Sequence, residues 1–194
     1  AGRPNGFGKM TFALGGEYEG EWLNGAPHGK GTARYQGGRT VTAEWSNGKR
    51  AGQAPAPAAR QYQMSSRSGK TTVTGQVPFD KGYADLNAAE KEAVRASYFL
   101  DEDDEPVYPV DGTKALTREV AGASARYAAG RQGEFIMFVD VDAAGVATKV
   151  SVYSTPAPAM SNYVAFHAMT QKYKPALCSG QPCAGRFMIR GALK

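Results

Sequence analysis

Histidine, cysteine and long apolar stretches are all scarce in this sequence. Its 194 residues include only two His and two Cys, whereas a structural zinc site takes about four such ligands. No run approaches the ~20 consecutive apolar residues that a membrane-spanning helix needs. The first residues also lack the apolar stretch of a secretory signal. A bound metal and a spanning helix are therefore not expected, and any export or anchoring segment is expected outside this chain.

Residue sets that typify enzymes are missing as well. Residues 69–71 read Gly-Lys-Thr, as at the end of a P-loop, but Met64 stands where that motif begins with glycine. His28 lies in a predicted turn where Asn5 stands one repeat earlier, and His167 lies among small residues of a predicted helix. No Ser-His-Asp or Cys-His set is apparent. We therefore expect a non-enzymatic protein without catalytic residues, metal or cofactor.

Charge is distributed unevenly along the chain. The net charge is +5 overall, +3 over residues 1–52 and −6 over residues 85–107. Because an acidic block interrupts the basic excess, nucleic acid is not an expected partner. The excess offers at most a weak, screened attraction to anionic lipid or cell-wall polymers. The five acids of residues 101–105 lack the turn-forming glycine of a calcium loop, so we expect a solvated loop there.

A period of 23 residues runs through the first 52 residues: Trp22 recurs as Trp45, and several glycines recur at the same step. Each unit predicts a β-hairpin. Residues 17–22 alternate polar residues with aromatic residues or glycine, residues 23–25 supply a turn, and residues 29–35 form the return strand. We expect the glycines to let strands approach closely and the aromatic side chains to stack along one face. These aromatic residues are Tyr18, Trp22, Tyr35 and Trp45.

The spacing of Tyr18, Gly20, Trp22, Gly25, Gly29 and Gly31 resembles that of the MORN repeat. In the next unit, Val41 and Ala43 replace the expected Tyr and Gly, so that unit is degenerate. The resemblance implies a rigid strand array that contacts proteins, itself or lipid, and it implies no catalysis. One complete unit flanked by two partial ones is too short to be stable alone. We therefore expect upstream repeats, a second chain or the rest of this chain to cover its open ends.

Residues 53–107 are predicted to connect two modules. Residues 53–59 are rich in Pro and Ala, as in a semi-stiff linker. Residues 61–77 predict one or two strands that turn at residues 68–69. Asn87 and Glu90 have the spacing of a capping box, which predicts a helix from there to about Tyr98.

Both cysteines lie in the short stretch Cys178-Ser-Gly-Gln-Pro-Cys183. The Gly and Pro between them favour a turn that brings the two flanks together. Since further zinc ligands are lacking, we predict a disulfide bond rather than a metal site. Disulfides persist in oxidising compartments, which favours the periplasm or the cell exterior.

Residues 134–193 predict three strands and a helix in the order β-β-α-β. A hairpin turns at Asp142–Gly145, and a last strand covers residues 185–193. We therefore expect a mainly β protein with a C-terminal α+β domain, an antiparallel sheet with a helix packed on one face. The first strand should carry Phe135, Met137, Val139 and Val141 on one face, and the second should carry Val146, Val150 and Val152 on one face. A helix from about Met160 to Tyr173 should direct Val164, Ala165, Ala168 and Met169 inward.

Several pieces of the back half occur in a recognisable order: Tyr108-Pro109, residues 139–146, residues 150–154, residues 173–176, residues 180–182 and the final strand. Together they resemble the C-terminal domain of the energy transducer TonB. The resemblance implies a periplasmic domain that adds an extended peptide of an outer-membrane transporter to its sheet edge, and some such domains bind cell wall. The chain lacks the membrane helix and Pro-rich spacer of TonB, so we expect a repurposed binding module.

Three regions follow: a MORN array over residues 1–52, a connecting region over 53–107 and a TonB-like domain over 108–194. The leading hypothesis is a protein-binding module of the bacterial periplasm or cell envelope, with an outer-membrane or envelope protein as its partner. Two alternatives stay open: a structural MORN scaffold that pairs chains into homodimers, and a binder of cell-wall or lipid surfaces.

The predicted binding edge is the last strand. Its candidate residues are Gly185, Arg186, Phe187, Met188, Ile189 and Arg190. A free edge offers unpaired N–H and C=O groups to an extended peptide. Arg186 and Arg190 flank Met188 on one face, where acidic or polar side chains of a peptide could bind. The edge could instead be covered by residues 61–77 or by a second chain.

Overall fold

Five antiparallel strands form the N-terminal lobe of the computed structural model, which describes residues 2–53, 60–65, 72–129 and 131–193. The strands are β1 (Gly6–Thr11), β2 (Glu17–Leu23), β3 (Ala26–Arg34), β4 (Thr40–Ser46) and β5 (Lys49–Arg50), and they pair in chain order. The tight turns at Asn24-Gly25 and Asn47-Gly48 have positive φ at both residues, as a two-residue hairpin requires. The predicted hairpins are therefore confirmed.

A short middle region follows. The strands β6 (Tyr62–Ser65) and β7 (Thr72–Gly75) pair only with each other among the described residues. A 3₁₀ turn η1 (Tyr83–Asp85) precedes α1 (Ala88–Arg95), which starts with the predicted capping box of Asn87 and Glu90. The helix ends at Arg95, before the predicted Tyr98. Residues 54–59 of the linker expected at residues 53–59, and the turn expected at residues 68–69, lie outside the described residues.

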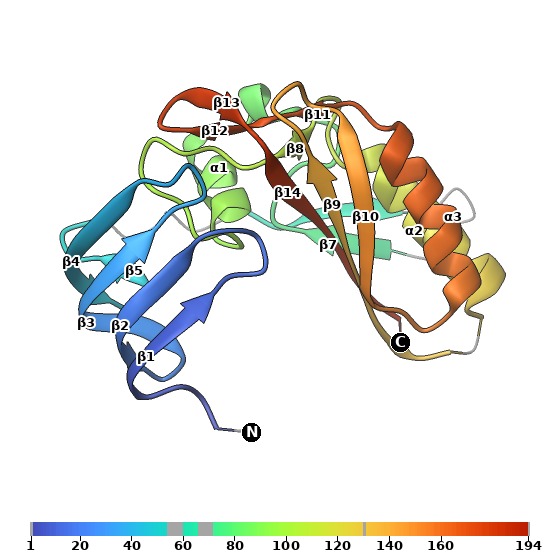
Figure 1. The fold of residues 1–194 in the computed structure, drawn as a ribbon. Helices are drawn as coiled ribbons and strands as arrows, with labels where there is room; N and C mark the ends of the chain where they lie inside the picture. The colour runs from blue at the N-terminus through green and yellow to red at the C-terminus, as the bar shows by residue number, and fades with distance from the viewer. Residues whose placement is uncertain (1, 54–59, 66–71, 130, 194) are drawn as a thin grey trace.

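Three strands and two helices build the C-terminal lobe. The strands β9 (Gly133–Val141), β10 (Ala147–Ser154) and β14 (Gly185–Leu193) form an antiparallel sheet in the order β10-β9-β14. The helices α2 (Lys114–Tyr127) and α3 (Pro158–Thr170) pack against one face of this sheet (Figure 1). Two small ladders complete the lobe: β8 (Tyr108–Pro109) with β11 (Tyr173–Lys174), and β12 (Ala176–Cys178) with β13 (Gln181–Cys183).

The core of this lobe lies between the sheet and the helices. Phe135, Met137, Val139 and Val141, predicted to share one face of β9, are at most 1 % exposed. They belong to one core cluster with Met160, Val164 and Ala168 of α3 and with Leu116 and Ala123 of α2. The structure thus contains the β9–β10 hairpin and the helix α3, which ends at Thr170, before the predicted Tyr173.

Parts of the prediction for this lobe are wrong. Val146 and Val152, predicted to share one face of the second strand with Val150, are 57 % and 46 % exposed, whereas Val150 packs against the core. Irregularities in the β10–β9 register, between Ala147 and Lys149 and again near Val152, break the simple alternation of faces. Met169, predicted inward, is 40 % exposed at the end of α3.

The helix α2 was not predicted at all. Its sequence contains Gly122, and Thr113 makes no side-chain hydrogen bond as its N-cap, so it lacks the usual starting signal of a helix. The β-β-α-β order therefore omits one helix that covers the same face of the sheet as α3.

Candidate partner-binding site

The four predicted aromatic residues line one face of the N-terminal sheet. Tyr18, Trp22, Tyr35 and Trp45 are each at most 5 % exposed. Tyr18 lies edge-on to both Trp22 and Trp45, with ring centroids 5.3 and 5.2 Å apart. We call this face, together with Phe12, the aromatic groove.

Glycines give the aromatic groove its close packing. Gly20 and Gly31 face each other across β2 and β3, and the ring of Tyr18 lies over Gly31. A Cβ atom on Gly31 would come within 2.1 Å of the Tyr18 hydroxyl oxygen. The tryptophans repeat one hydrogen bond: Trp22 Nε1 donates to Gly8 O at 3.0 Å, and Trp45 Nε1 donates to Gly31 O at 3.1 Å. The 23-residue period thus reappears in the bonding of the sheet.

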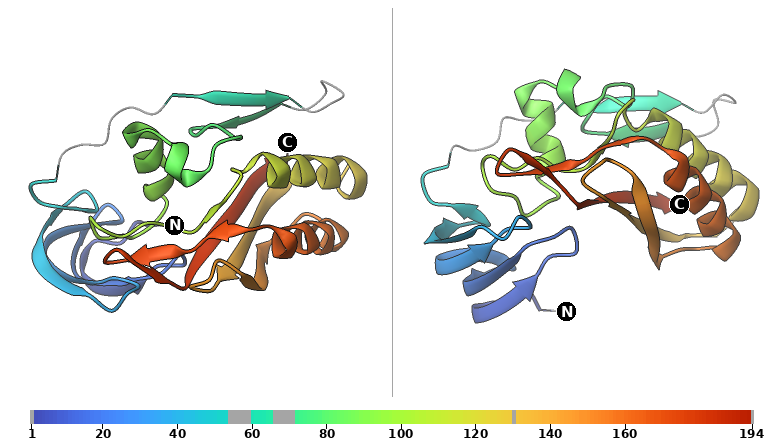
Figure 2. Two further views of the ribbon diagram at one scale, coloured as in Figure 1. Left: turned by 90° about the horizontal axis from the view of Figure 1, so that it is seen from above. Right: turned by 45° about the horizontal axis from the view of Figure 1, so that its top comes forward.

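Phe99, which follows α1, fills the aromatic groove. Its ring stacks on Phe12 at 4.2 Å and 18° and on Tyr35 at 5.4 Å and 25°. It also stacks on Trp45 at 5.8 Å. Figure 2 shows the chain after α1, in yellow-green, passing between the two lobes. The rest of the chain therefore covers this face of the array, and sequence reasoning did not single out Phe99.

The acidic residues 101–105 are only in part the solvated loop that we expected, because Glu102 and Asp103 are exposed but two other carboxylates are buried. Asp101 and Asp104 are 2 % and 3 % exposed. Arg39 of the N-terminal lobe places Nη1 2.7 Å from Asp101 Oδ2, and Arg50 lies 3.8 Å from the other oxygen. Arg95 of α1 donates to the backbone carbonyls of Asp101 and Asp104. Two buried carboxylates become tolerable because cations and backbone donors surround them.

The same arrangement affects a tyrosine of the groove. Burial, together with the nearby carboxylate of Asp101, raises the pKa of Tyr35 from 10.0 to about 12. Removal from water disfavours the phenolate, and a neighbouring negative charge disfavours it further. The phenol of Tyr35 therefore stays neutral to a higher pH than an exposed tyrosine does.

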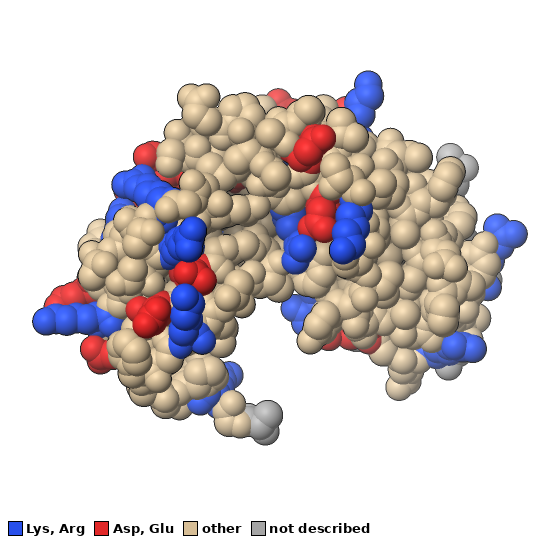
Figure 3. All heavy atoms as spheres, in the orientation of Figure 1, with Lys and Arg blue, Asp and Glu red and all other residues tan. Residues whose placement is uncertain are grey.

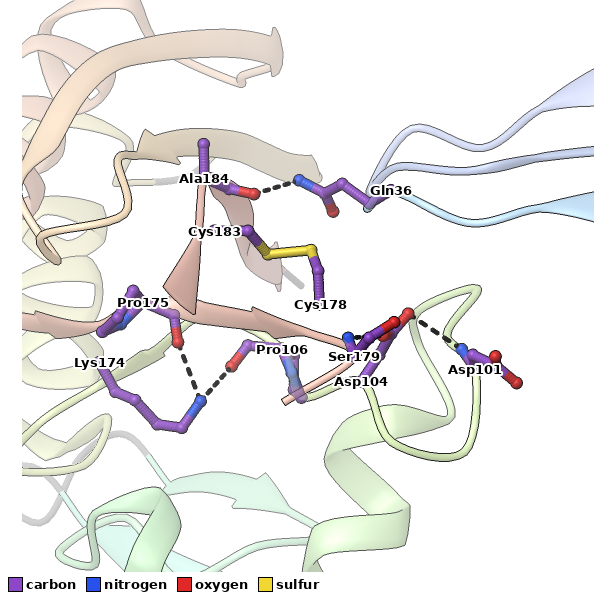
Figure 4. The surroundings of a disulfide bond; sticks show 10 residues. All are labelled: Gln36, Asp101, Asp104, Pro106, Lys174, Pro175, Cys178, Ser179, Cys183 and Ala184. Carbon is purple, nitrogen blue, oxygen red and sulfur yellow. Dashed lines mark hydrogen bonds between the residues drawn. A yellow bond between two sulfur atoms is a disulfide. The ribbon is translucent and has the colours of Figure 1, made fainter. Parts of the chain in front are cut away.

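The disulfide lies at the junction of the lobes (Figure 4). Cys178 and Cys183 are bonded, with Cα atoms 5.9 Å apart, which confirms the prediction. A Cβ atom on Gly37 would lie 2.6 Å from Cys178 Cβ, so the β3–β4 turn packs directly on the β12–β13 hairpin. Asp104 Oδ1 accepts from the Ser179 N–H at 2.9 Å. The disulfide hairpin thus contacts both the N-terminal lobe and the acidic segment.

The predicted edge strand β14 pairs with β9 and with no other strand among the described residues. In Figure 1 it is the strand of its sheet nearest the N-terminal lobe. The strands β6 and β7 pair with each other, so the sheet pairing leaves β14 at an edge rather than covered by residues 61–77 as a further strand.

The hydrogen bonds around β9 show which groups of β14 face the open edge. The Asp142 N–H donates to Val146 O at 3.0 Å. The carbonyls of Asp140 and Glu134 accept from side chains of β10 at 3.1 and 2.8 Å. The backbone N–H and C=O groups of even-numbered residues of β9 therefore point toward β10, and those of odd-numbered residues point toward β14.

In register, Val139 of β9 pairs with Phe187 of β14. Odd-numbered residues of β14 therefore bond to β9, and the N–H and C=O groups of Arg186, Met188 and Arg190 point away from the sheet. These outward groups are the ones that an added strand would use.

Two side chains lie at the start of that edge. Gln36 Nε2 donates to Ala184 O at 2.6 Å, which joins the N-terminal lobe to the start of β14. Tyr98 lines a small cavity with Gly185 and Arg186, and burial raises the pKa of its hydroxyl.

The side chains of Arg186, Met188 and Arg190 share the face of the sheet opposite the helices. Arg186 Nε lies 2.6 Å from Asp140 Oδ1 on β9, and its Nη1 donates to Ala13 O of the N-terminal lobe. Arg190 pairs with Glu134. Both guanidinium groups are therefore engaged, which weakens the prediction that they read acidic residues of a peptide.

The surface between the lobes is hollowed, and its charges are mixed (Figure 3). Blue and red atoms lie next to each other on both lobes, and no large patch of one sign appears on this face. Within the described ranges of the chain, no group of three or more His, Cys, Asp or Glu side chains could hold a metal ion. In the same residues, no helix is both long and apolar enough to cross a membrane.

Comparison with known proteins identifies the N-terminal repeats. The family model described as MORN repeat matches residues 1–16, 18–38 and 42–54, so MORN repeats form the N-terminal lobe. Comparison with curated proteins and with solved structures gave no match. The resemblance of residues 108–194 to TonB therefore stays a prediction from sequence.

Proposed function

We propose that this chain is a non-enzymatic protein-binding module of the bacterial periplasm or cell envelope, which binds an extended partner segment by β-strand addition to β14. The observation that carries the proposal is the one-sided pairing of β14, with the backbone groups of Arg186, Met188 and Arg190 directed outward. Such groups seek partners, and an extended chain satisfies them in register. The TonB resemblance suggests the same strand, and the disulfide favours an oxidising compartment.

Amide exchange with a bound probe tests this proposal. Linear ten-residue peptides selected from a phage-displayed library on the full chain serve as probes. Strand addition predicts that a bound peptide slows exchange at Arg190 and its outward neighbours, and leaves Ile189, already bonded to β9, unchanged. Protection confined to the MORN strands, or selection of no peptide that protects β14, would contradict the proposal.

A second function has one observation in its favour. The strand β1 is an edge strand of the MORN sheet and pairs only with β2 among the described residues. Phe7 on this strand is 76 % exposed. Pairing of two chains through β1 would make a homodimeric scaffold. A mass that rises with concentration in wild-type protein, and stays monomeric in Phe7→Lys, would favour this function.

The third candidate, a binder of cell-wall or lipid surfaces, draws only on the net charge of +5. Its affinity for vesicles containing anionic lipid should collapse with added salt, because exposed charges are screened within about 10 Å at 0.1 M salt. Strand addition, which relies on backbone hydrogen bonds, should change far less.

A further inference from the structure

The C-terminal sheet has a second free edge, on the side that faces away from the N-terminal lobe. The strand β10 pairs with β9 and with no other strand in the parts of the chain that the structure describes. Figure 1 shows β10 beside α3, on the side of the molecule opposite the N-terminal lobe. Large apolar side chains are exposed on these two elements and on the turn before β10. These residues, each at least 40 % exposed, are Val146, Val152, Tyr153, Phe166 and Met169.

Bulges limit the part of this edge that can pair with another strand. The register between β10 and β9 shifts between Ala147 and Lys149 and again between Val152 and Ser154. At both places a side chain of β10 donates to a backbone carbonyl of β9, and such irregularities interrupt regular pairing. The regular stretch therefore runs from Lys149 to Val152. An added strand gains few backbone hydrogen bonds there, so specific binding needs further contacts.

Within this stretch, the backbone groups alternate between β9 and the open edge. Ser151 pairs with Phe138, an even-numbered residue of β9 whose N–H and C=O groups point toward β10. Odd-numbered residues of β10 therefore bond to β9, and the groups of Val150 and Val152 point outward. These two residues are the ones that a further strand would use.

The outward residues match each other across a two-fold axis through Ser151. When a second copy of β10 lies antiparallel about this axis, Val150 lies opposite Val152 of that copy, and Val152 lies opposite its Val150. Each pair joins two outward residues, so each exchanges two N–H···O bonds. The valine side chains share the face of the sheet that carries the helices, and their contact removes the exposed surface of Val152 from water.

On the other face of the sheet, the same register brings Lys149 next to Tyr153 of the second copy. The Tyr153 ring is 78 % exposed and lies edge-on to Phe138, with centroids 6.3 Å apart. An ammonium group is attracted to such a ring. The two copies of Lys149 stand four residue steps apart, or ~13 Å, so like charges do not meet. The edge is therefore complementary to itself in hydrogen bonds, apolar contacts and charge.

The helix α3 offers a suitable flank beside this edge. Tyr163 and His167 face α2, where Glu119 Oε2 lies 2.7 Å from the Tyr163 hydroxyl and 3.6 Å from His167 Nε2. By helical spacing, Ala165 and Met169 lie on the flank turned away from α2. A small residue and a flexible apolar residue therefore face the side on which a second α3 would approach.

We propose that two copies of this chain associate through β10 into a homodimer, in which the two C-terminal sheets join into one. The interface is the same surface on both copies, so it closes on itself and does not grow into a fibre. The occupant is a second copy because only the two-fold arrangement adds the valine pairs, the two Lys149–Tyr153 contacts and the α3 flanks to the few backbone bonds. Both β14 edges stay at the outer ends of the joined sheet, so the dimer does not depend on the proposed strand addition.

Sedimentation of the full chain tests the dimer. The mass should rise with concentration from 20.6 kDa to twice that value. Val152→Lys should raise the dissociation constant at least about tenfold, because it buries an unpaired charge opposite Val150. The matched control is Val146→Lys, the same change at an exposed residue outside the paired stretch, and it should dimerise like wild type. Phe7→Lys, on the edge of the MORN sheet, should also dimerise. Calorimetry at low concentration checks that each variant folds.

A cysteine on the axis tests the register. Ser151 lies opposite its own counterpart in a pair without mutual hydrogen bonds, where Cα atoms are ~4.5 Å apart, within the range of a disulfide. Mild oxidation of Ser151→Cys should therefore link two chains, as a non-reducing gel shows. Thr148→Cys should not link, because its counterpart lies six residue steps away, or ~20 Å. Cys178 and Cys183 are bonded to each other, so the added thiol reports alone.

The outcomes separate β10 from the other edges. A wild-type mass of 20.6 kDa at every concentration overturns the inference, and so does a dimer that Val152→Lys leaves intact. A dimer that only Phe7→Lys abolishes assigns the contact to β1 and overturns it as well. Failure of Ser151→Cys to link, or equal linking of Thr148→Cys, overturns the two-fold pairing. None of these results changes the expected protection of β14 by a bound peptide, which tests strand addition separately.

Discussion

Phe99→Ala should selectively destabilise the N-terminal lobe. The ring stacks on three aromatic neighbours, Phe12, Tyr35 and Trp45, and no other residue of 98–104 belongs to their cluster. Truncating a fully buried Phe to Ala costs about 3–5 kcal/mol. Because Phe99 is only half-buried, we expect the loss in unfolding free energy to be about 2–3 kcal/mol.

The two tryptophans make this loss measurable in one lobe. Trp22 and Trp45 are the only tryptophans of the chain, and both lie in the aromatic groove. Urea unfolding followed by tryptophan fluorescence therefore reports on the MORN sheet, and the midpoint should fall in Phe99→Ala. Phe166→Ala, at a residue of α3 that is 67 % exposed, should change the same transition by less than about 0.5 kcal/mol. A Phe99→Ala transition as stable as that of the control would refute our account of how the groove is covered.

Three further predictions follow from the same structure. Reducing the disulfide, or replacing both cysteines by serine, should lower the unfolding free energy by about 2 kcal/mol through the short loop that it closes; thiol labelling of unreduced, denatured protein should find no free cysteine. Gly31→Ala should disrupt the MORN sheet, since the added Cβ would collide with the Tyr18 ring. Gly122→Ala, in open space on α2, should instead stabilise the protein by about 0.5–1 kcal/mol. Calorimetry that finds both variants as stable as wild type would contradict this account of the packing. The neutral form of Tyr35 stabilises the fold fully below pH 10, and because its folded pKa is raised to about 12, that stability should be lost as pH rises from 10 through 12. In Tyr35→Phe, the loss of unfolding free energy over this pH window should be smaller. An identical pH profile for wild type and variant would contradict this prediction.

The elements that could be predicted from sequence are those with local signals. The MORN hairpins follow from a 23-residue period and from Asn-Gly turns, and the α1 start follows from the Asn87 capping box. The disulfide follows from the turn-forming residues between two cysteines. Each of these signals spans only a few residues, so one sequence is enough to read it.

What the sequence left open depends on contacts between distant residues. Phe99 and Asp101 are far apart in sequence from the MORN residues that they contact, and no local pattern marks them as partners. One signal was present: residues 1–52 carry net positive charge and residues 85–107 net negative charge. Opposite charge alone, however, does not say that Arg39 and Asp101 meet.

The position of Phe99 also sets an order of events during synthesis of the chain. Strands β1 to β5 pair through contacts close in sequence, so the sheet can form early. Its aromatic groove, however, stays uncovered until the ribosome has synthesised Phe99, which lies more than 50 positions after Trp45 in the sequence. During that interval the growing chain exposes stacked aromatic rings, which is the kind of surface that chaperones recognise and that drives aggregation. A nascent chain halted before Phe99 should therefore be held by chaperones, and one that has emerged through residue 104 should be released.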